Sequence, residues 1–228
     1  MKKEKLHLYF VPGLAASTAI FEYIKLDESK YTIHLLPWLI PLSKEESLEN
    51  YAKRMCKSIT EKNHVLIGVS FGGIMVQEMS KISHPLKTII ISSVKHHNEM
   101  PLRLKIAKNT RAYKLTPVKA LTNIEKFATY LYGDTIKKRA ELYQKYLSMR
   151  DKKYLPWSIK NVLHWKQNSE NNNIIHIHGN KDGIFPIKNI NNCIIVEGGT
   201  HIMILNKARK ISMILEETLD AEYKQILK

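Results

Sequence analysis

The chain alternates continuous apolar runs with stretches of helical periodicity, and this alternation restricts its fold more than any other feature. The apolar runs cover residues 6–11, 31–38, 64–69, 86–94, 174–177 and 193–196. Runs that are apolar at successive positions are typical of strands buried on both faces. Between them, residues 47–60, 71–83 and 202–219 carry apolar side chains at helical spacing. The pattern predicts an α/β fold with a mostly parallel, doubly wound sheet of about six strands.

Residues 95–170 interrupt this alternation. Pro101, Pro117 and Pro156 divide the stretch, which otherwise has a mostly helical pattern and contains no convincing core strand. We therefore expect an α/β core formed by residues 1–94 and 171–228, and a helical cap insertion formed by residues 95–170. A chain of 228 residues is long enough for one such core with a modest insertion.

The chain is strongly basic, with a formal net charge of +15. Such a charge is compatible with binding to nucleic acid, a membrane surface or an acidic substrate. Lysine, however, outnumbers arginine 30 to 6, whereas arginine is the residue that binds phosphate in bidentate fashion. We therefore expect no nucleic-acid partner, while a single basic patch on the folded protein would favour one.

Two features bear on the compartment. No apolar run reaches the length of a transmembrane helix. The lysines that precede residues 6–11 imitate a signal peptide, but Pro12 and Gly13 break the apolar run that follows them. We therefore expect a cytoplasmic protein without a transmembrane segment.

The two cysteines show no spacing typical of chemistry. Cys56 falls in a helical pattern and Cys193 opens an apolar run, and neither belongs to a Cys-x-x-Cys or Cys/His cluster. Both are predicted to be small buried hydrophobes, so we expect no zinc site, and the sequence gives no support for a disulfide.

The strongest motif is Gly68-Val69-Ser70-Phe71-Gly72, which matches G-x-S-x-G. In this motif a serine lies on a tight turn between a strand and a helix, where its hydroxyl is exposed above the sheet. The flanking residues must be small because the turn brings backbone close to backbone. An apolar run ends at Ser70 and a helical pattern begins directly after it, so Ser70 is the candidate nucleophile.

A serine nucleophile needs a base, and the base needs an acceptor that orients it. Asp182 follows the apolar run 174–177, and His201 follows the run 193–196. Residues just past the strand ends lie at the carboxyl edge of a parallel sheet, where α/β proteins place their sites. The sequence therefore predicts that His201 is the general base and that Asp182 orients it.

These three loops resemble those of a known superfamily. The elbow at Ser70, the stretch His178-Gly179-Asn180-Lys181-Asp182 and the stretch Gly198-Gly199-Thr200-His201 are similar to the nucleophile, acid and histidine loops of α/β-hydrolases. The resemblance covers most of the sheet, and it implies a cap where residues 95–170 lie. In one departure, the family's first two strands have no counterpart before the run 6–11.

The resemblance also implies an oxyanion hole. Pro12-Gly13-Leu14-Ala15 follows the first apolar run, where many family members have His-Gly instead of Pro-Gly. By resemblance, the backbone N–H groups of Leu14 and Phe71 are the two oxyanion donors.

Other candidates have simpler interpretations. Asp134 and Asp151 compete for the role of the acid, but helix capping is the more typical role of such residues. His176 and His178 alternate on one strand without a third ligand, so no metal site is expected and His178 is predicted to be structural. His96 and His97 are expected to be exposed. Three tryptophans either line an acyl pocket or belong to the core, namely Trp38, Trp157 and Trp165.

The predicted activity is ester hydrolysis through an acyl-enzyme, which requires no cofactor. The substrate would be a small-molecule ester or thioester, and its binding residues are not identified by the sequence. Three alternatives remain open: an acyltransferase, a carbon–carbon hydrolase using the same triad, or a ligand-binding protein of slow turnover.

The positive charge is concentrated in the expected cap. Residues 95–170 contain 17 lysines and arginines against 6 acids, a net charge of +11 out of +15. We hypothesise that the cap attracts anionic substrates, while four apolar residues line the acyl side, namely Ile124, Phe127, Tyr130 and Leu131. The alternative is a solvated helical face whose charges serve only solubility.

Overall fold

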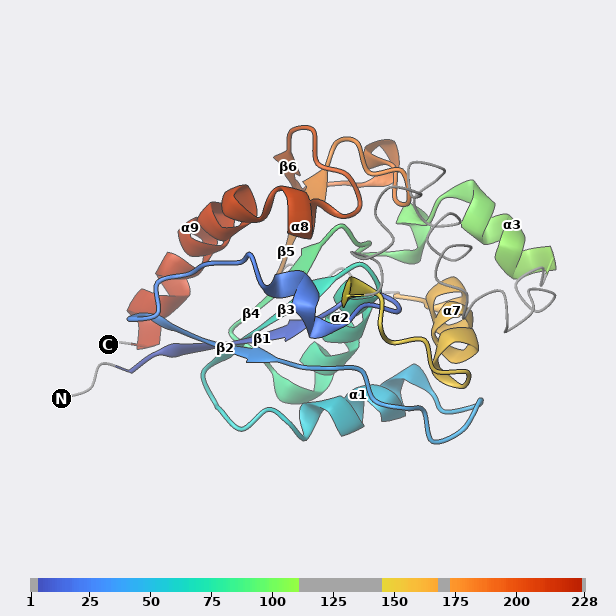
Figure 1. Ribbon diagram of the computed structural model, residues 1–228, viewed down its shortest axis with the longest axis horizontal. Coiled ribbons are helices and arrows are strands. Elements are labelled where there is room, and N and C mark those ends of the chain that lie inside the picture. The colour runs from blue at the N-terminus through green and yellow to red at the C-terminus, as the bar shows by residue number, and fades with distance from the viewer. Residues whose placement is uncertain (1–3, 111–144, 168–172, 227–228) are drawn as a thin grey trace.

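The computed structural model describes residues 4–110, 145–167 and 173–226 (Figure 1). Within these residues, six strands form one sheet in the order β2-β1-β3-β4-β5-β6. All five strand pairings are parallel. The strands are β1 (Leu6–Val11), β2 (Tyr31–Leu35), β3 (His64–Val69), β4 (Lys87–Ile91), β5 (Ile174–Gly179) and β6 (Ile194–Val196). The predicted α/β fold class and the number of strands are confirmed.

Burial explains which strands lie at the centre of the sheet. Every residue of β3 is buried, as are the last four residues of β1 and of β4. At the edges, only the first residue of β2 is buried and the others are half-buried or exposed, and in β6 the side chains of Ile194 and Ile195 are exposed. Strands β1, β3 and β4 therefore correspond to the apolar runs that are covered on both faces, whereas the runs of β2 and β6 lie at the sheet edges.

Helices cover both faces of this sheet. The α-helices are α1 (Leu48–Cys56), α2 (Phe71–Ser83), α3 (Leu102–Thr110), α7 (Tyr154–His164), α8 (Met203–Asn206) and α9 (Ala208–Ile226), and the 3-10 helices are η1 (Thr18–Phe21), η2 (His97–Glu99) and η5 (Ile187–Asn189). Figure 1 shows η1 and α9 on one face of the sheet and α1 and α2 on the other. Ser47 begins α1 by accepting a hydrogen bond from the Asn50 N–H, as expected of an N-cap.

Some predicted element ends were wrong. The second strand, expected over residues 31–38 with its end near Pro37, ends at Leu35, two residues before this proline, which lacks the N–H that a ladder requires. The fourth strand ends at Ile91, since Ser92 has a φ of 48°. The closing helix, predicted as one segment over 202–219, is two helices separated by Lys207, whose φ of −126° is not helical.

Part of the expected cap falls outside the described residues, namely 111–144 and 168–172. The described parts of residues 95–170 contain η2, α3 and α7 and no strand. The acyl-side candidates of the cap and Asp134 also lie outside the described residues.

The strand order places a switch point beside β1. The chain passes from β1 outward to β2 and then returns to β3 on the other side of β1. In open α/β sheets, ligands bind outside the carboxyl ends of the strands at such a point. The loops that follow β1 and β3 meet there, and these are the loops of Pro12-Gly13 and of Ser70.

Candidate active site

Ser70 lies on a sharp turn between β3 and α2. Its backbone has φ 54° and ψ −118°, a conformation that a non-glycine residue rarely adopts. Its N–H donates to the Ile91 carbonyl at 2.9 Å, and its carbonyl accepts from the Gly73 N–H at 2.9 Å and from Ser93 Oγ at 2.7 Å. The strained turn is thus hydrogen-bonded to β4, to α2 and to the loop that follows β4.

The glycines of the motif are required by close backbone contacts. A Cβ atom at Gly68 would overlap the backbone of Gly72, and one at Gly72 would overlap the Pro12 carbonyl. A Cβ atom at Gly73 would overlap the side chain of Ser93. The G-x-S-x-G spacing is therefore explained by the packing of α2 against the ends of the strands, as the sequence predicted.

The structure brings Ser70, His201 and Asp182 together from the ends of β3, β6 and β5. His201 Nε2 lies 2.9 Å from Ser70 Oγ, and His201 Nδ1 lies 2.9 Å from Asp182 Oδ2. Because a carboxylate only accepts hydrogen bonds, Nδ1 carries the proton and donates a hydrogen bond to Asp182. Nε2 is then free to accept the hydroxyl proton of Ser70.

Asp182 is 4% exposed, yet its environment favours the charged form. Burial raises its pKa, but the charge of His201, the hydrogen bond to His201 and the N–H of Phe185 together lower the pKa below its usual value. Oδ1 accepts from the N–H groups of Ile184 at 2.7 Å and Phe185 at 2.9 Å. The carboxylate is thus held by the turn that follows β5.

Phe185 also restricts the base. Its ring contacts the imidazole of His201 edge-on, with centroids 5.5 Å apart. One residue therefore donates its N–H to Asp182 and packs its side chain on His201. Like Ser93, it was not predicted, because no sequence motif marks either residue.

Two buried histidines lie behind Asp182. His178 Nε2 donates to the Phe185 carbonyl at 2.8 Å and lies 3.6 Å from Asp182 Oδ2. Its Nδ1 therefore carries no proton and accepts a hydrogen bond of 3.0 Å from the His176 Nε2–H group. Burial lowers the pKa of both histidines, and most strongly that of His176. This pair supports the acid loop, in agreement with the structural role predicted for His178.

The loop that follows β1 lies against the nucleophile. A Cβ atom built at Gly13 would be 3.6 Å from Ser70 Cβ, so Gly13 lies beside Ser70. The N–H groups of Leu14 and Phe71 donate to no other group among the described residues. Both remain available for an oxyanion next to Ser70.

Two residues of the expected cap, Tyr146 and Met149, hydrogen-bond to this loop. The Ala15 carbonyl accepts from the Met149 N–H at 3.0 Å, and the Ser17 N–H donates to the Tyr146 carbonyl at 2.8 Å. Ala15 itself has a φ of 61°, so the loop turns sharply directly after Leu14.

The remaining sequence candidates lie elsewhere. Asp151 accepts from the N–H groups of Lys153 and Tyr154 at the start of α7, which is the capping role expected for it. His96 and His97 are half-buried rather than exposed, and His97 Nδ1 lies 3.2 Å from the Gln167 carbonyl.

The three tryptophans are buried. Trp38 is 7% exposed, Trp157 is 2% exposed and Trp165 is 5% exposed. Each indole N–H donates a hydrogen bond within the described residues. All three therefore contribute to packing and to hydrogen bonding.

Neither cysteine belongs to the site. Cys56 and Cys193 are both free and half-buried. Burial raises the pKa of Cys56 to about 11, and burial also raises the pKa of Cys193. Both thiols therefore stay protonated and unreactive near neutral pH.

Across residues 4–110, 145–167 and 173–226, no group of three or more His, Cys, Asp or Glu side chains is arranged to hold a metal ion. In the same part of the chain, no helix has the length and apolar character needed to cross a membrane.

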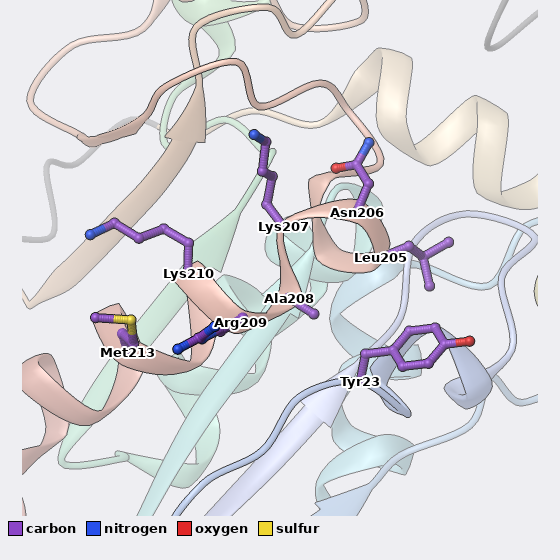
Figure 2. A pocket seen from close by; sticks show the side chains of 8 residues that line it. All are labelled: Tyr23, Leu205, Asn206, Lys207, Ala208, Arg209, Lys210 and Met213. Atoms are coloured by element: carbon purple, nitrogen blue, oxygen red, sulfur yellow. The ribbon is translucent and has the colours of Figure 1, made fainter.

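A pocket of about 460 Å³ lies at the junction of α8 and α9 (Figure 2). Its lining is basic and apolar and consists of Tyr23, Leu205, Asn206, Lys207, Ala208, Arg209, Lys210 and Met213. Neither Ser70 nor His201 lines it. The pocket adds three cations outside the expected cap, so the positive charge is not confined to residues 95–170.

Comparisons place this architecture among known structures. No family model and no curated protein matches the chain. An esterase from Thermogutta terrifontis is 12% identical with a TM-score of 0.66, covering 97% of this chain and 92% of its own. A lipase-esterase related protein from Clostridium acetobutylicum is 17% identical with a TM-score of 0.63, covering 95% and 96%. An epoxide hydrolase from Bacillus megaterium is 13% identical with a TM-score of 0.68, covering 96% and 95%.

These similarities extend over nearly the whole of each chain. Taken with the elbow after β3 and the loops after β5 and β6, they show that the chain has the fold of the α/β-hydrolase superfamily.

Proposed function

We propose that the chain is a serine hydrolase that cleaves a carboxylic ester or thioester of a small molecule through an acyl-enzyme. One observation carries the proposal: Ser70, His201 and Asp182 form a continuous hydrogen-bonded relay, with both heavy-atom distances at 2.9 Å. The esterase and the lipase-esterase related protein of similar fold agree with this activity. The epoxide hydrolase shows that the same fold also serves other reactions, so the proposal rests on the site.

In the first half-reaction, Ser70 Oγ attacks the carbonyl carbon as its proton passes to His201 Nε2. The imidazolium that forms is stabilised by Asp182, whose carboxylate is ionised and already bonded to Nδ1. The proton then passes from Nε2 to the leaving group, the carbon–oxygen or carbon–sulfur bond breaks, and an ester to Ser70 remains.

The tetrahedral intermediate carries a negative charge on the former carbonyl oxygen. The N–H groups of Leu14 and Phe71 are the donors in our proposal, and Phe71 is the first residue of α2. The N-terminus of this 13-residue helix adds the positive end of its dipole. One donor of this kind contributes about 3 kcal/mol to the transition state.

In the second half-reaction, water replaces the leaving group. His201 Nε2 takes a proton from water, the hydroxide attacks the acyl carbon, and the proton returns to Ser70 Oγ as the acid leaves. This sequence uses only side chains and backbone groups of the chain, so it needs no metal and no organic cofactor.

The test compares wild-type protein with Ser70→Ala on p-nitrophenyl esters of rising acyl length. We expect hydrolysis by the wild type, loss of hydrolysis in Ser70→Ala, and covalent labelling of Ser70 by a fluorophosphonate. Full activity in Ser70→Ala, or labelling of a different serine, would contradict the assignment. The acyl length with the highest kcat/KM defines the substrate class further.

The alternatives give different outcomes in the same assay. An acyltransferase would divert the acyl group to an added alcohol instead of water. A carbon–carbon hydrolase would leave p-nitrophenyl esters nearly untouched while hydrolysing a β-diketone. A slow ligand-binding protein would be labelled at Ser70 and release product in a single burst.

A further inference from the structure

Trp38 occupies a position that links the two proposed oxyanion donors. It lies in the segment after β2, far from the elbow in sequence, and its side chain is 7% exposed. Its indole N–H donates to the Gly13 carbonyl at 2.8 Å. Its ring stacks on Phe71, with centroids 5.0 Å apart and planes inclined by 20°.

The hydrogen bond acts on a particular peptide unit. The Gly13 carbonyl and the Leu14 N–H belong to the same peptide, which is planar and trans, so the two groups point in opposite directions. Fixing the carbonyl therefore fixes the direction of the N–H. The same carbonyl also accepts from the Ala16 N–H at 3.0 Å, so two donors hold it.

The indole is itself held in place. Tyr51 and Tyr154 flank Trp38, with ring centroids 6.2 and 5.5 Å away. The hydroxyl of Tyr51 donates to the Leu39 carbonyl at 2.7 Å and accepts from the Leu39 N–H at 2.8 Å, which fixes the backbone beside Trp38. This buried aromatic surrounding leaves the indole little freedom to rotate.

We propose that Trp38 is a positioning residue of the oxyanion hole, whose N–H orients the Gly13–Leu14 peptide so that the Leu14 N–H meets the oxyanion. The inference rests on the proposed function, since it concerns the same intermediate. Catalysis benefits when donors are oriented before charge develops, because no reorganisation is then needed in the transition state. Loss of the orienting bond should therefore lower kcat and leave substrate binding nearly unchanged.

The test compares Trp38→Phe with Trp157→Phe. Trp157 is a matched control: it is buried, it donates its indole N–H to a backbone carbonyl at 2.8 Å, and it contacts Phe71 edge-on. Its acceptor, however, is Glu46, which is outside the oxyanion loop. Outright removal of a donor costs about 10²–10³-fold in kcat, so we expect about a tenfold loss for Trp38→Phe with KM unchanged, and no loss for Trp157→Phe.

A second measurement separates orientation from packing. A trifluoromethyl ketone adds Ser70 Oγ to its carbonyl carbon and places the resulting oxyanion in the hole, whereas the matching methyl ketone binds without appreciable addition. We expect Trp38→Phe to weaken the trifluoromethyl ketone by about the same factor as kcat, and to leave the methyl ketone unaffected.

If Trp38→Phe does not fold, benzothienylalanine at position 38 keeps the shape of the indole and replaces only its N–H with sulfur. Wild-type kcat in either variant, or an equal loss of both ketones, overturns the inference. If the wild type neither hydrolyses esters nor reacts with a fluorophosphonate, the proposed function fails, and this inference fails with it.

Discussion

At the scale of single residues, Asp182 determines the tautomer of the base. Its Oδ2 accepts a hydrogen bond from His201 Nδ1–H, and its Oδ1 accepts hydrogen bonds from two backbone N–H groups. In Asp182→Asn the amide oxygen is needed at the Oδ1 position, where it accepts from the two backbone N–H groups, so the amide NH2 faces the imidazole. Nδ1 must then accept a hydrogen bond, which favours the tautomer in which Nε2 carries the proton and cannot accept the hydroxyl proton of Ser70.

We therefore expect Asp182→Asn to lower kcat by about 10⁴-fold while the protein remains folded. Asp151→Asn is the control, since Asp151 caps α7 and should leave kcat unchanged. Ester hydrolysis and circular dichroism measure the two properties. If Asp134→Asn proves the damaging change and Asp182→Asn does not, the acid has been assigned to the wrong residue.

At the scale of elements, the elbow depends on how closely α2 approaches the end of β1. A Cβ atom at Gly72 would overlap the Pro12 carbonyl. This overlap could be removed only if α2 or the loop after β1 moved. Gly183, in contrast, has no atom within 4 Å of the place where its Cβ would be, and its φ is not positive.

We expect Gly72→Ala to reduce the free energy of unfolding by about 1–3 kcal/mol, the usual cost of overpacking, and to reduce esterase activity strongly, because the shift moves Phe71 away from Leu14. Gly183→Ala should change stability by less than about 0.5 kcal/mol. Urea unfolding measures both variants. Equal stability of the two would show that α2 has room to move.

The elements also show what the sequence could predict. Apolar runs identified all six strands, because central strands that are covered on both faces are mostly apolar, and the edge strands β2 and β6 retain enough apolar residues to be recognised. Element ends depended on single backbone angles, as at Ser92 and Lys207, which the pattern of side chains does not encode.

The candidate site divides in the same way. Ser70, Asp182 and His201 were found because each follows a strand within a recognisable motif. Phe185 was missed, and Trp38 was considered only for an acyl pocket or the core, since the contacts of both residues depend on which loops the fold brings together.

At the scale of the whole molecule, buried histidines affect the stability in acid. Burial lowers the pKa of His64, His176 and His178, so these residues stay neutral in the folded protein. In the unfolded chain a histidine titrates near about 6.5. Below that pH the unfolded chain binds protons that the folded protein does not, so the free energy of unfolding falls as pH falls.

We expect the urea midpoint to be constant at neutral pH and to fall below about pH 6.5, with each such histidine contributing at most about 1.4 kcal/mol per pH unit. His64→Gln should make this dependence shallower, because glutamine can replace the bonds to the Lys62 carbonyl and Ser83 Oγ without titrating. His84→Asn is the control, since His84 is exposed and asparagine tolerates its φ of 48°. An unchanged slope in His64→Gln would contradict this explanation.

The net charge of +15 is also a property of the whole molecule, and +11 of it comes from residues 95–170. The basic pocket at the α8–α9 junction adds to the positive potential outside this segment (Figure 2). Such a potential raises the encounter rate with anions and is screened by salt, with a Debye length of about 10 Å at 0.1 M.

We therefore expect kcat/KM for p-nitrophenyl hemisuccinate, an anionic ester, to decline steeply as ionic strength rises. The control substrate is p-nitrophenyl butyrate, which is similar in length and neutral, and its kcat/KM should stay nearly constant because steering acts only on charge. Replacing Lys207 and Lys210 with glutamine tests whether the pocket contributes, since both lie outside the expected cap. A decline that persists in this double variant would show that Lys207 and Lys210 are not needed for steering. Parallel salt curves for the two esters would instead mean that the positive charge serves solubility and has no part in the choice of substrate.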